Sequence, residues 1–500
     1  MEAAKALIEQ REQVQNDLVK KTPPSPAGPI DPSEAATLPE PPAIQLPRFL
    51  QVLRFNQRQI ELMFKARREL GEVFRMRGMV AGRPTITSHP DHVRSLFKAK
   101  PEQAPSLTRE SPLRPVVGPN SVLTAVGERH MRQRKLLLPS FHGEAIQRYV
   151  QMISDAAERE ISSWPVGTPV ALAPRMQAIT LDVIMGGIFG IEGKPARGTV
   201  EGRLRYATRS LVQASTWPLA QVAELMNIGR DEPRGFTKIG LSMLDRATHA
   251  VIEDRRRAKD LDERKDILSM LLLARNEQGE SLSDDEVRDE LTTLVLAGHE
   301  TTGTALAWAL ECLLQRPAIV RRIREEMAEV AGPGEAPRGR EPLAKLEYLD
   351  AAIKEVLRFR PIMAFGGTRL LQAPWRLGEW EIPAGAAVAN ALSMVHRRPD
   401  LYPEPHEFRP ERFLGKRPDP YEWTPFGGGV RRCLGMAFAL YEMKIVLAHL
   451  LSTIDLELAD SQPVRAVTRG FFIAPEKGLP IRIRPGAAHR VEARAQARPS

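Results

Sequence analysis

Residues 425–435 read PFGGGVRRCLG, and an apolar stretch, MAFALYEMKIVLAHLL, follows them directly. The loop contains three consecutive glycines, two arginines and Cys433, which is one of only two cysteines in 500 residues. The ionised thiolate is the form of cysteine that ligates metals, and its pKa falls beside cations and at the start of a helix. The glycines leave room for a flat ligand to approach the backbone. The stretch therefore indicates a ligating cysteine in a tight loop just before a helix.

Other interpretations of this loop fit less well. A dinucleotide fingerprint needs G-x-G-x-x-G, and Arg432 stands where the third glycine belongs. A phosphate-binding P-loop needs G-K-[ST], which is absent here. A nucleophilic cysteine would need a histidine partner, and no signature of that kind surrounds Cys433. A buried structural cysteine in a turn stays open as the plain alternative.

Composition bounds the class of protein. At 42% hydrophobic residues the chain can bury a large core. Two cysteines exclude a disulfide framework and a Cys₄ zinc site, and they favour a reducing, intracellular setting. The formal charge of +9, from 71 basic and 62 acidic side chains, is dispersed along the chain. That excess suits a docking face for an acidic protein at least as well as it suits nucleic acid.

The most apolar window, residues 291–314, is long enough to span a bilayer. His299, Glu300 and three threonines lie in its middle, however, and ionisable residues are rare at that depth. The first residues, MEAAKALIEQREQVQNDLVKK, carry charges throughout and lack the apolar core of a signal peptide. We therefore expect a soluble, cytoplasmic protein.

Linkers and hydrophobic periods predict the organisation of the chain. The segment TPPSPAGPIDPSEAATLPEPPAIQLP carries nine prolines, which predicts a flexible N-terminal extension over residues 1–45. One large domain is expected over 46–485, followed by a disordered tail over 486–500. A β-hairpin and a helix are expected over 72–93, and short strands over 374–395. Helices are predicted over 143–162, 174–190, 235–258 and 343–359.

The clearest helix signal begins at Ser283. Ser283 and Glu286 have the spacing of a capping box, and acidic residues fill the first turn. The pattern continues until Pro317, which gives about 50 Å of helix. The fold class predicted from these elements is mainly α with small β-sheets.

The pattern F-x-x-G-x-R-x-C-x-G resembles the haem-ligand loop of the cytochrome P450 family. Its members here are Phe426, Gly429, Arg431, Cys433 and Gly435. The resemblance implies a triangular-prism fold and haem b, with Cys433 as the axial thiolate of the iron. It also implies that Phe426 shields the sulfur and that Arg431 pairs with a haem propionate.

Residues 297–302, AGHETT, lie within the long predicted helix. A carboxylate beside a hydroxyl, here Glu300 and Thr301, can relay protons. A chance polar cluster in a helix interior is the alternative. The hexapeptide is similar to the family's oxygen-activation motif, which implies that Thr301 steadies the oxygen substrate and Glu300 delivers protons.

Three further segments carry the resemblance. Glu355 and Arg358 match the family's E-x-x-R, and Arg412 in RPERF matches its later arginine; the family uses this triad structurally. His130 and Arg134, four residues apart on one helical face, resemble its W/H-x-x-x-R pattern for haem propionates. Without the resemblance, a surface ion pair and a basic surface helix would explain these residues. Arg369 matches a propionate-binding arginine by position more than by motif.

The five segments occur in the family's order, and the resemblance covers residues 46–485. It implies a monooxygenase that uses O₂, two electrons and two protons to give ROH and water. Two cysteines cannot hold an iron–sulfur cluster and no flavin module fits, so electrons must arrive from a separate ferredoxin or flavodoxin with its reductase. Arg431, Arg432 and Lys135 would provide a basic docking surface for that partner.

By family position, the substrate pocket is lined by apolar side chains, which favours a fatty acid, terpenoid or steroid. These side chains are Val116, Val117, Leu294, Ala297, Ile362, Met363, Phe365 and Phe472. His299, His396 and His406 are interpreted as structural. Three alternatives stay open: a peroxide-driven hydroxylase of the same fold, a non-catalytic haem-thiolate sensor, and a helical binding protein without haem.

Overall fold

The computed structural model describes residues 23–31, 38–77, 84–106, 113–193, 195–215, 232–275, 279–460, 462–469 and 472–484. The predictions for residues 1–22, 32–37 and 486–500 lie outside the described residues. The chain forms two compact units, each built from two stretches of sequence. Unit 1 comprises Met1–Leu107 and Lys354–Cys433, and unit 2 comprises Thr108–Ile353 and Leu434–Ser500.

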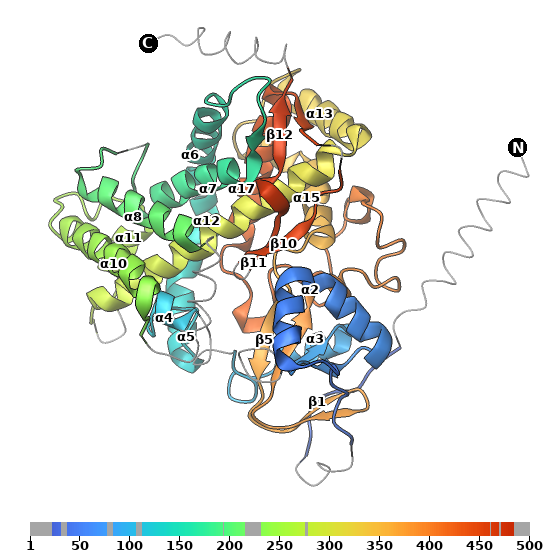
Figure 1. Cartoon of the computed structure of the whole chain (residues 1–500). Coiled ribbons are helices and arrows are strands. Elements are labelled where there is room, and N and C mark those ends of the chain that lie inside the picture. Colours follow the sequence, from blue (N-terminus) through green and yellow to red (C-terminus); the bar gives the residue numbers. More distant parts are fainter. Residues whose placement is uncertain are drawn as a thin grey trace, which may run out of the picture. The chain divides into compact units, whose positions relative to one another are not determined.

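The described residues of unit 1 form small sheets and short to medium helices (Figure 1). One sheet has the order β2-β3-β8-β5, in which only β3 and β8 are parallel, and the other has the order β1-β6-β7. The strands are β1 (Ala27–Pro29), β2 (Phe74–Arg75), β3 (Thr85–Thr87), β5 (Phe365–Leu370), β6 (Trp375–Leu377), β7 (Trp380–Ile382) and β8 (Ala387–Ala391). The helices are α2 (Arg48–Leu70), α3 (Pro90–Lys98) and α16 (Leu392–Val395), with 3₁₀ turns η2 (Pro410–Arg412) and η3 (Gly429–Arg431).

The predicted hairpin and the strands after residue 374 are confirmed. β2 pairs antiparallel with β3, and α3 begins at Pro90 with the His89 side chain as its N-cap. Pro90 suits the first helical position because its missing N–H is not needed there. β1 lies in the proline-rich segment and pairs antiparallel with β6, so residues 27–29 form part of the sheet of unit 1.

Unit 2 is mainly helical. Its helices are α4 (Arg114–Val117), α5 (Gly127–Leu137), α6 (Glu144–Ile161), α7 (Leu172–Phe189), α8 (Val200–Ser215), α10 (Gly235–Arg256), α11 (Ile267–Leu273), α12 (Asp284–Leu314), α13 (Pro317–Ala331), α14 (Arg340–Ala344), α15 (Glu347–Phe359), which continues into unit 1, and α17 (Met436–Thr453). The 3₁₀ turns are η1 (Leu138–Phe141) and η4 (Glu476–Gly478). Its strands are β4 (Val170–Ala171), β9 (Leu456–Leu458), β10 (Ala466–Arg469), β11 (Phe472–Pro475) and β12 (Pro480–Ile483). β10 and β11 form a hairpin, and the other three strands form a sheet in the order β4-β12-β9.

α12 is the long helix that the sequence predicts, and its ends are satisfied as expected. The Ser283 hydroxyl accepts a hydrogen bond from the Glu286 N–H (3.2 Å), and the Glu286 carboxylate accepts one from the Ser283 N–H (3.0 Å). At the other end, Arg316 donates to the carbonyl oxygen of Cys312 (2.7 Å). These caps pair backbone groups that the helix itself leaves without a partner at each terminus.

Two glycines let α7 and α12 pack side by side (Figure 1). A Cβ at Gly298 would lie 2.4 Å from Cδ1 of Ile184, and a Cβ at Gly303 would lie 3.0 Å from the Gln177 side chain. Both Ile184 and Gln177 belong to α7. Gly298 of the AGHETT motif therefore serves packing between these two helices.

The single helix predicted over 343–359 is partly wrong, because the chain forms α14 and then begins α15 at Glu347. Glu326 of α13 explains the new start. Its carboxylate accepts hydrogen bonds from the N–H groups of Tyr348 (2.6 Å) and Leu349 (3.0 Å), which lie in the first turn of α15. A carboxylate at a helix N-terminus stabilises that terminus, and this contact is not visible in the local sequence.

Among the described residues, α17 is the one helix whose length and apolar composition would allow it to cross a membrane. Most of it is buried inside unit 2, as in the core helix of a soluble protein.

Candidate functional site

The cysteine loop is closed by its own backbone. The Cys433 N–H donates to the carbonyl oxygen of Phe426 (3.0 Å), and the Arg432 N–H donates to that of Gly429 (3.1 Å). Cys433 is exposed, whereas the other cysteine, Cys312, is buried in α12. The loop therefore presents one accessible thiol immediately before α17 in the chain.

Two glycines of this loop pack against the protein itself. A Cβ at Gly428 would lie 1.9 Å from the Phe97 ring, and one at Gly429 would lie 2.0 Å from the Phe97 carbonyl oxygen. Gly427 and Gly429 also have φ of +64°, which side chains with a Cβ rarely adopt. Two of the three glycines thus allow the loop to pack on α3.

Two polar side chains hold the loop at Thr424. The Thr424 N–H donates to Nε2 of His396 (3.0 Å), and the Asn390 amide donates to the Thr424 hydroxyl (3.0 Å). His396 and Asn390 are fully buried, and burial lowers the pKa of His396 to about 3, so its ring is neutral and able to accept. Sequence analysis left His396 only as a structural residue and missed Asn390, which carries no motif.

Arg369 of β5 is a buried cation. Its side chain is 3% exposed, and burial lowers the pKa of its guanidinium to about 10. It donates to the carbonyl oxygens of Thr368 (3.3 Å) and Gly428 (3.4 Å), and it lies over the Phe97 ring at 5.7 Å. Among the described residues no carboxylate pairs with it. A buried guanidinium held only by carbonyls and a ring fits an anionic ligand group.

Unit 1 also brings Glu355, Arg358 and Arg412 together. Arg358 donates twice to the Glu355 carboxylate, at 2.6 and 2.7 Å, and neither side chain is exposed to solvent. Nε of Arg412 lies 3.5 Å from the same carboxylate. The remaining Arg358 hydrogens go to carbonyl oxygens of the segment 396–407, which leads toward the cysteine loop.

In unit 2, the candidate catalytic residues lie in the middle of α12. The Thr301 hydroxyl donates to the carbonyl oxygen of Ala297 (2.7 Å), so the lone pairs of its Oγ1 are left to accept from another group. Ala297 is exposed, and Glu300 and Thr301 are half-buried. His299 is buried on the other side, where burial lowers its pKa to about 4. The motif therefore divides into an open face and a packed face.

α5 carries His130, which is buried, and Arg134, which is half-buried, one helical turn apart. The candidate pocket residues of unit 2 are Val116 and Val117 of α4, Leu294 and Ala297 of α12, and Phe472 of β11. α12 packs against both α4 and β11. In unit 1, Ile362 is half-buried and Met363 exposed, while Phe365 stacks on Phe55 of α2 with ring centroids 5.5 Å apart. The partly buried Phe365 ring thus also packs against the core of unit 1.

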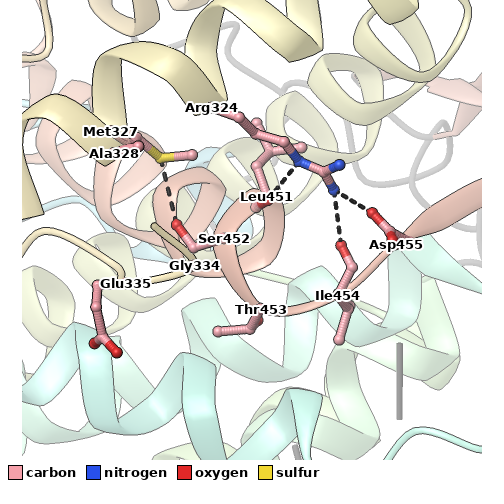
Figure 2. Close-up of a pocket in the computed structure, with 10 residues that line it drawn as sticks. All are labelled: Arg324, Met327, Ala328, Gly334, Glu335, Leu451, Ser452, Thr453, Ile454 and Asp455. Atoms are coloured by element: carbon pink, nitrogen blue, oxygen red, sulfur yellow. Dashed lines mark hydrogen bonds and ion pairs between the residues drawn. The ribbon is translucent and has the colours of Figure 1, made fainter. Parts of the chain in front are cut away.

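A separate hollow of unit 2 contains none of these residues. It lies between α13 and the end of α17, and Arg324 crosses it to donate to the carbonyl oxygens of Leu451 (2.8 Å) and Ile454 (3.2 Å) and to the Asp455 carboxylate (2.6 Å; Figure 2). Because Arg324, which is only half-buried, is already paired by these contacts, we interpret the hollow as structural.

The residues of unit 1 fit a haem. Unit 1 supplies an exposed thiol, a ligand suited to haem iron, and a buried guanidinium suited to a propionate.

Comparison with known proteins agrees with this fit. The family model described as cytochrome P450 matches residues 39–481. Cytochrome P450 137 of Mycobacterium tuberculosis is 36% identical over 437 residues, which cover 85% of each chain. Cytochrome P450 138 of Mycobacterium bovis is 33% identical over 442 residues, covering 88% of this chain and 95% of the relative.

Two solved structures share the mainly helical fold with small sheets. The retinoic acid bound cyanobacterial CYP120A1 superposes with a TM-score of 0.77 at 27% identity, covering 89% of this chain and 99% of that one. The cytochrome P450DA heme domain gives a TM-score of 0.75 at 23% identity, covering 91% and 99%.

Proposed function

Because the chain belongs to the cytochrome P450 family and is therefore a haem-thiolate monooxygenase, we propose that it inserts one oxygen atom of O₂ into a lipophilic small molecule. The haem supplies oxygen activation when bound, and the protein supplies ligation, proton delivery and substrate orientation. The observation that carries the site assignment is the exposed thiol of Cys433 in a loop held rigidly at Thr424.

Within this proposal, Cys433 ligates the iron, and Arg369 and Arg431 from unit 1 hold haem propionates. His130 and Arg134 of α5 are the proposed propionate contacts from unit 2. Phe426 shields the sulfur, and Gly429 and Gly435 allow the turns on either side of it. Glu355, Arg358 and Arg412 have a structural role, because they anchor the segment that leads to the loop.

Glu300 and Thr301 manage protons in this proposal. The Thr301 hydroxyl already donates its hydrogen to the Ala297 carbonyl oxygen. Its oxygen therefore accepts a hydrogen bond from a group in the pocket. Glu300, one residue away and half-buried, carries protons from solvent.

Replacing Glu300 with glutamine is expected to lower product formation about 100-fold, since proton transfer by a positioned side chain contributes factors of that order. Haem content and the substrate-induced spectrum should stay unchanged. Turnover with a saturating electron donor measures the effect, and the product rate divided by electron consumption shows whether electrons are wasted. The same measurement applies to the hydroxyl of Thr301. Thr301→Ala removes this hydroxyl, and Thr301→Ser keeps it and is the matched control. A Glu300→Gln variant with normal coupling and rate would remove Glu300 from proton delivery.

The substrate class rests on the apolar side chains proposed for the pocket and on one relative. Val117 and Leu294 are buried aliphatic residues, and the solved relative of 27% identity has retinoic acid bound. We propose a fatty acid, terpenoid or steroid. Optical titration of the ferric protein with members of each class, including retinoic acid, tests this proposal. A low-to-high-spin shift with one class identifies it, and a shift only with polar compounds would contradict it.

Electrons are proposed to come from a separate ferredoxin or flavodoxin with its reductase, and the protein is proposed to be cytoplasmic. Arg431 and Arg432 in the cysteine loop and the exposed Lys135 of α5 provide positive charge for an acidic partner. Lys135→Glu should slow reduction by the ferredoxin at low salt and weaken its salt dependence, whereas an unchanged rate would count against this docking charge.

A further inference from the structure

The loop of residues 118–125 connects α4 to α5, and it is fastened to α12 by two acidic side chains. The Asn120 N–H donates to the Asp289 carboxylate (2.9 Å), and the Val122 N–H donates to the Glu290 carboxylate (3.2 Å). The hydroxyls of Ser121 and Thr293 lie 2.6 Å apart, which adds a third link to the same helix. Three successive contacts therefore fix this loop along one turn of α12.

The loop and α12 are in close contact at Gly118. Gly118 has φ of +82°, and a Cβ there would lie 2.2 Å from the carboxyl atoms of Asp289. Asp289 and Glu290 are each 2% exposed. Burying two adjacent carboxyl groups is unfavourable unless they are hydrogen-bonded, and the backbone N–H groups of the loop supply those bonds.

α5 holds the loop from its other end. Gln133 donates to the carbonyl oxygen of Asn120, and Arg129 donates to the Asn120 side chain. Inside the loop, the Thr124 hydroxyl donates to the Gly118 carbonyl (2.7 Å). The loop is thus a rigid link between α12 and the helix that carries His130 and Arg134.

We propose that Asp289 and Glu290 are positioning residues that set the shape of the substrate pocket by holding the 118–125 loop on α12. This inference rests on the proposed function, in which Val116 and Val117, directly before Gly118, line the pocket. Neither acid need touch the substrate. Both act through the loop and through α4.

The protonation state of Glu290 makes the contact between the 118–125 loop and α12 sensitive to pH. One of its oxygens, Oε1, is buried with no hydrogen-bond partner in the described part of the chain. The pKa of Glu290 is raised to about 8, mainly because burial desolvates the carboxyl group. The Val122 N–H and the Arg129 charge oppose this rise, and the charges of Asp289 and Glu286 add to it. The charged groups around the acid pair are Glu286 and Arg288 on α12, Arg129 and Arg132 on α5, and Asp245 on α10.

The direction of the effect follows from linkage. A held loop binds the Glu290 proton more tightly than a released loop, in which the pKa returns toward the ordinary value of 4.5. The held state is therefore fully stabilised below pH 4.5, weakens as pH rises, and reaches its lowest stability above about pH 8.

Two haem ligands of different size test the proposal on the holoenzyme. Pyridine needs only the haem, whereas 4-phenylpyridine must also fit the pocket, and the nitrogen of both is unprotonated across the range used. Between about pH 6.5 and 8.5 the affinity for 4-phenylpyridine relative to pyridine should fall by at least about tenfold, because the held state loses about a factor of ten in stability for each pH unit until about pH 8. Glu290→Gln keeps the acceptor for Val122 and should show the low-pH ratio throughout.

Asp285→Asn, an exposed change in the first turn of the same helix, is the matched control and should behave as the wild type. Hydrogen exchange of the 118–125 loop provides a second measurement. The wild type should lose protection of the loop amides at high pH, whereas Glu290→Gln should keep it. A wild-type ratio independent of pH, or the same slope in Glu290→Gln, would overturn the inference and leave the monooxygenase intact. A protein that takes up haem but binds neither pyridine would overturn the proposed function and this inference together.

Discussion

Replacing Cys433 with serine is expected to abolish monooxygenase activity and the red-shifted optical band of the reduced carbon monoxide complex. A thiolate donates strongly to haem iron, whereas a serine hydroxyl does not ionise near neutral pH and is a poor ligand. Since no other thiol of the chain is exposed among the described residues, nothing nearby can replace it. Spectra of the reduced protein with carbon monoxide and product formation with a substrate found by titration measure the two effects.

Cys312→Ala is the matched control for this experiment. Cys312 is fully buried in α12, so its removal should lower stability slightly and leave the optical band in place. A Cys433→Ser protein that keeps the band, or a Cys312→Ala protein that loses it, would contradict the assignment of the ligand.

Local signals predicted the parts of this fold that depend on neighbouring residues. The capping box of Ser283 and Glu286 and the end of α12 before Pro317 could be read directly, because both are satisfied within one turn. The spacing of Glu355 and Arg358 likewise fixed a contact three residues apart on one helix. Motif spacing was therefore informative where the residues in contact are only a few positions apart in the chain.

Long-range contacts were not predictable in the same way. Glu290 and Val122 are 168 residues apart in the chain, and nothing in either segment identifies the other. Asp289 and Glu290 belong to the polar run DDEVRDE that opens α12, directly before the apolar stretch from Leu291, so the sequence does not distinguish them from the exposed acids beside them. The break before α15 has the same origin, since Glu326 of another helix determines where α15 begins.

The glycines show why residue type alone is ambiguous. Gly428 was expected to leave room for a flat ligand, yet a Cβ there would meet the Phe97 ring of this chain, and a Cβ at Gly298 would meet Ile184. A missing Cβ signals close packing without naming the partner. Only the tertiary structure distinguishes protein packing from ligand contact.

Arg358→Ala is expected to lower the free energy of unfolding by about 3–5 kcal/mol, because it leaves the buried Glu355 carboxylate without its main partner. Arg358 makes two bonds to Glu355 and three to the carbonyl oxygens of His396 (2.8 Å), Pro405 (2.9 Å) and Glu407 (3.1 Å). Lysine cannot reproduce this planar arrangement, so Arg358→Lys should lose most of the same stability. Urea denaturation followed by circular dichroism measures the change.

The control is Arg257→Ala in the exposed pair with Glu253 on α10, where both side chains are more than half exposed and the expected loss is at most about 0.5 kcal/mol. A third variant separates the buried charge from the lost hydrogen bonds. If the uncompensated carboxylate causes most of the loss, adding Glu355→Gln to Arg358→Ala should restore part of the stability, since the remaining group is then neutral. Equal stability of the single and double variants would instead place the loss in the three carbonyl bonds that hold residues 396–407. Arg358→Ala within about 1 kcal/mol of the wild type would show that this pair does not anchor the path to Cys433.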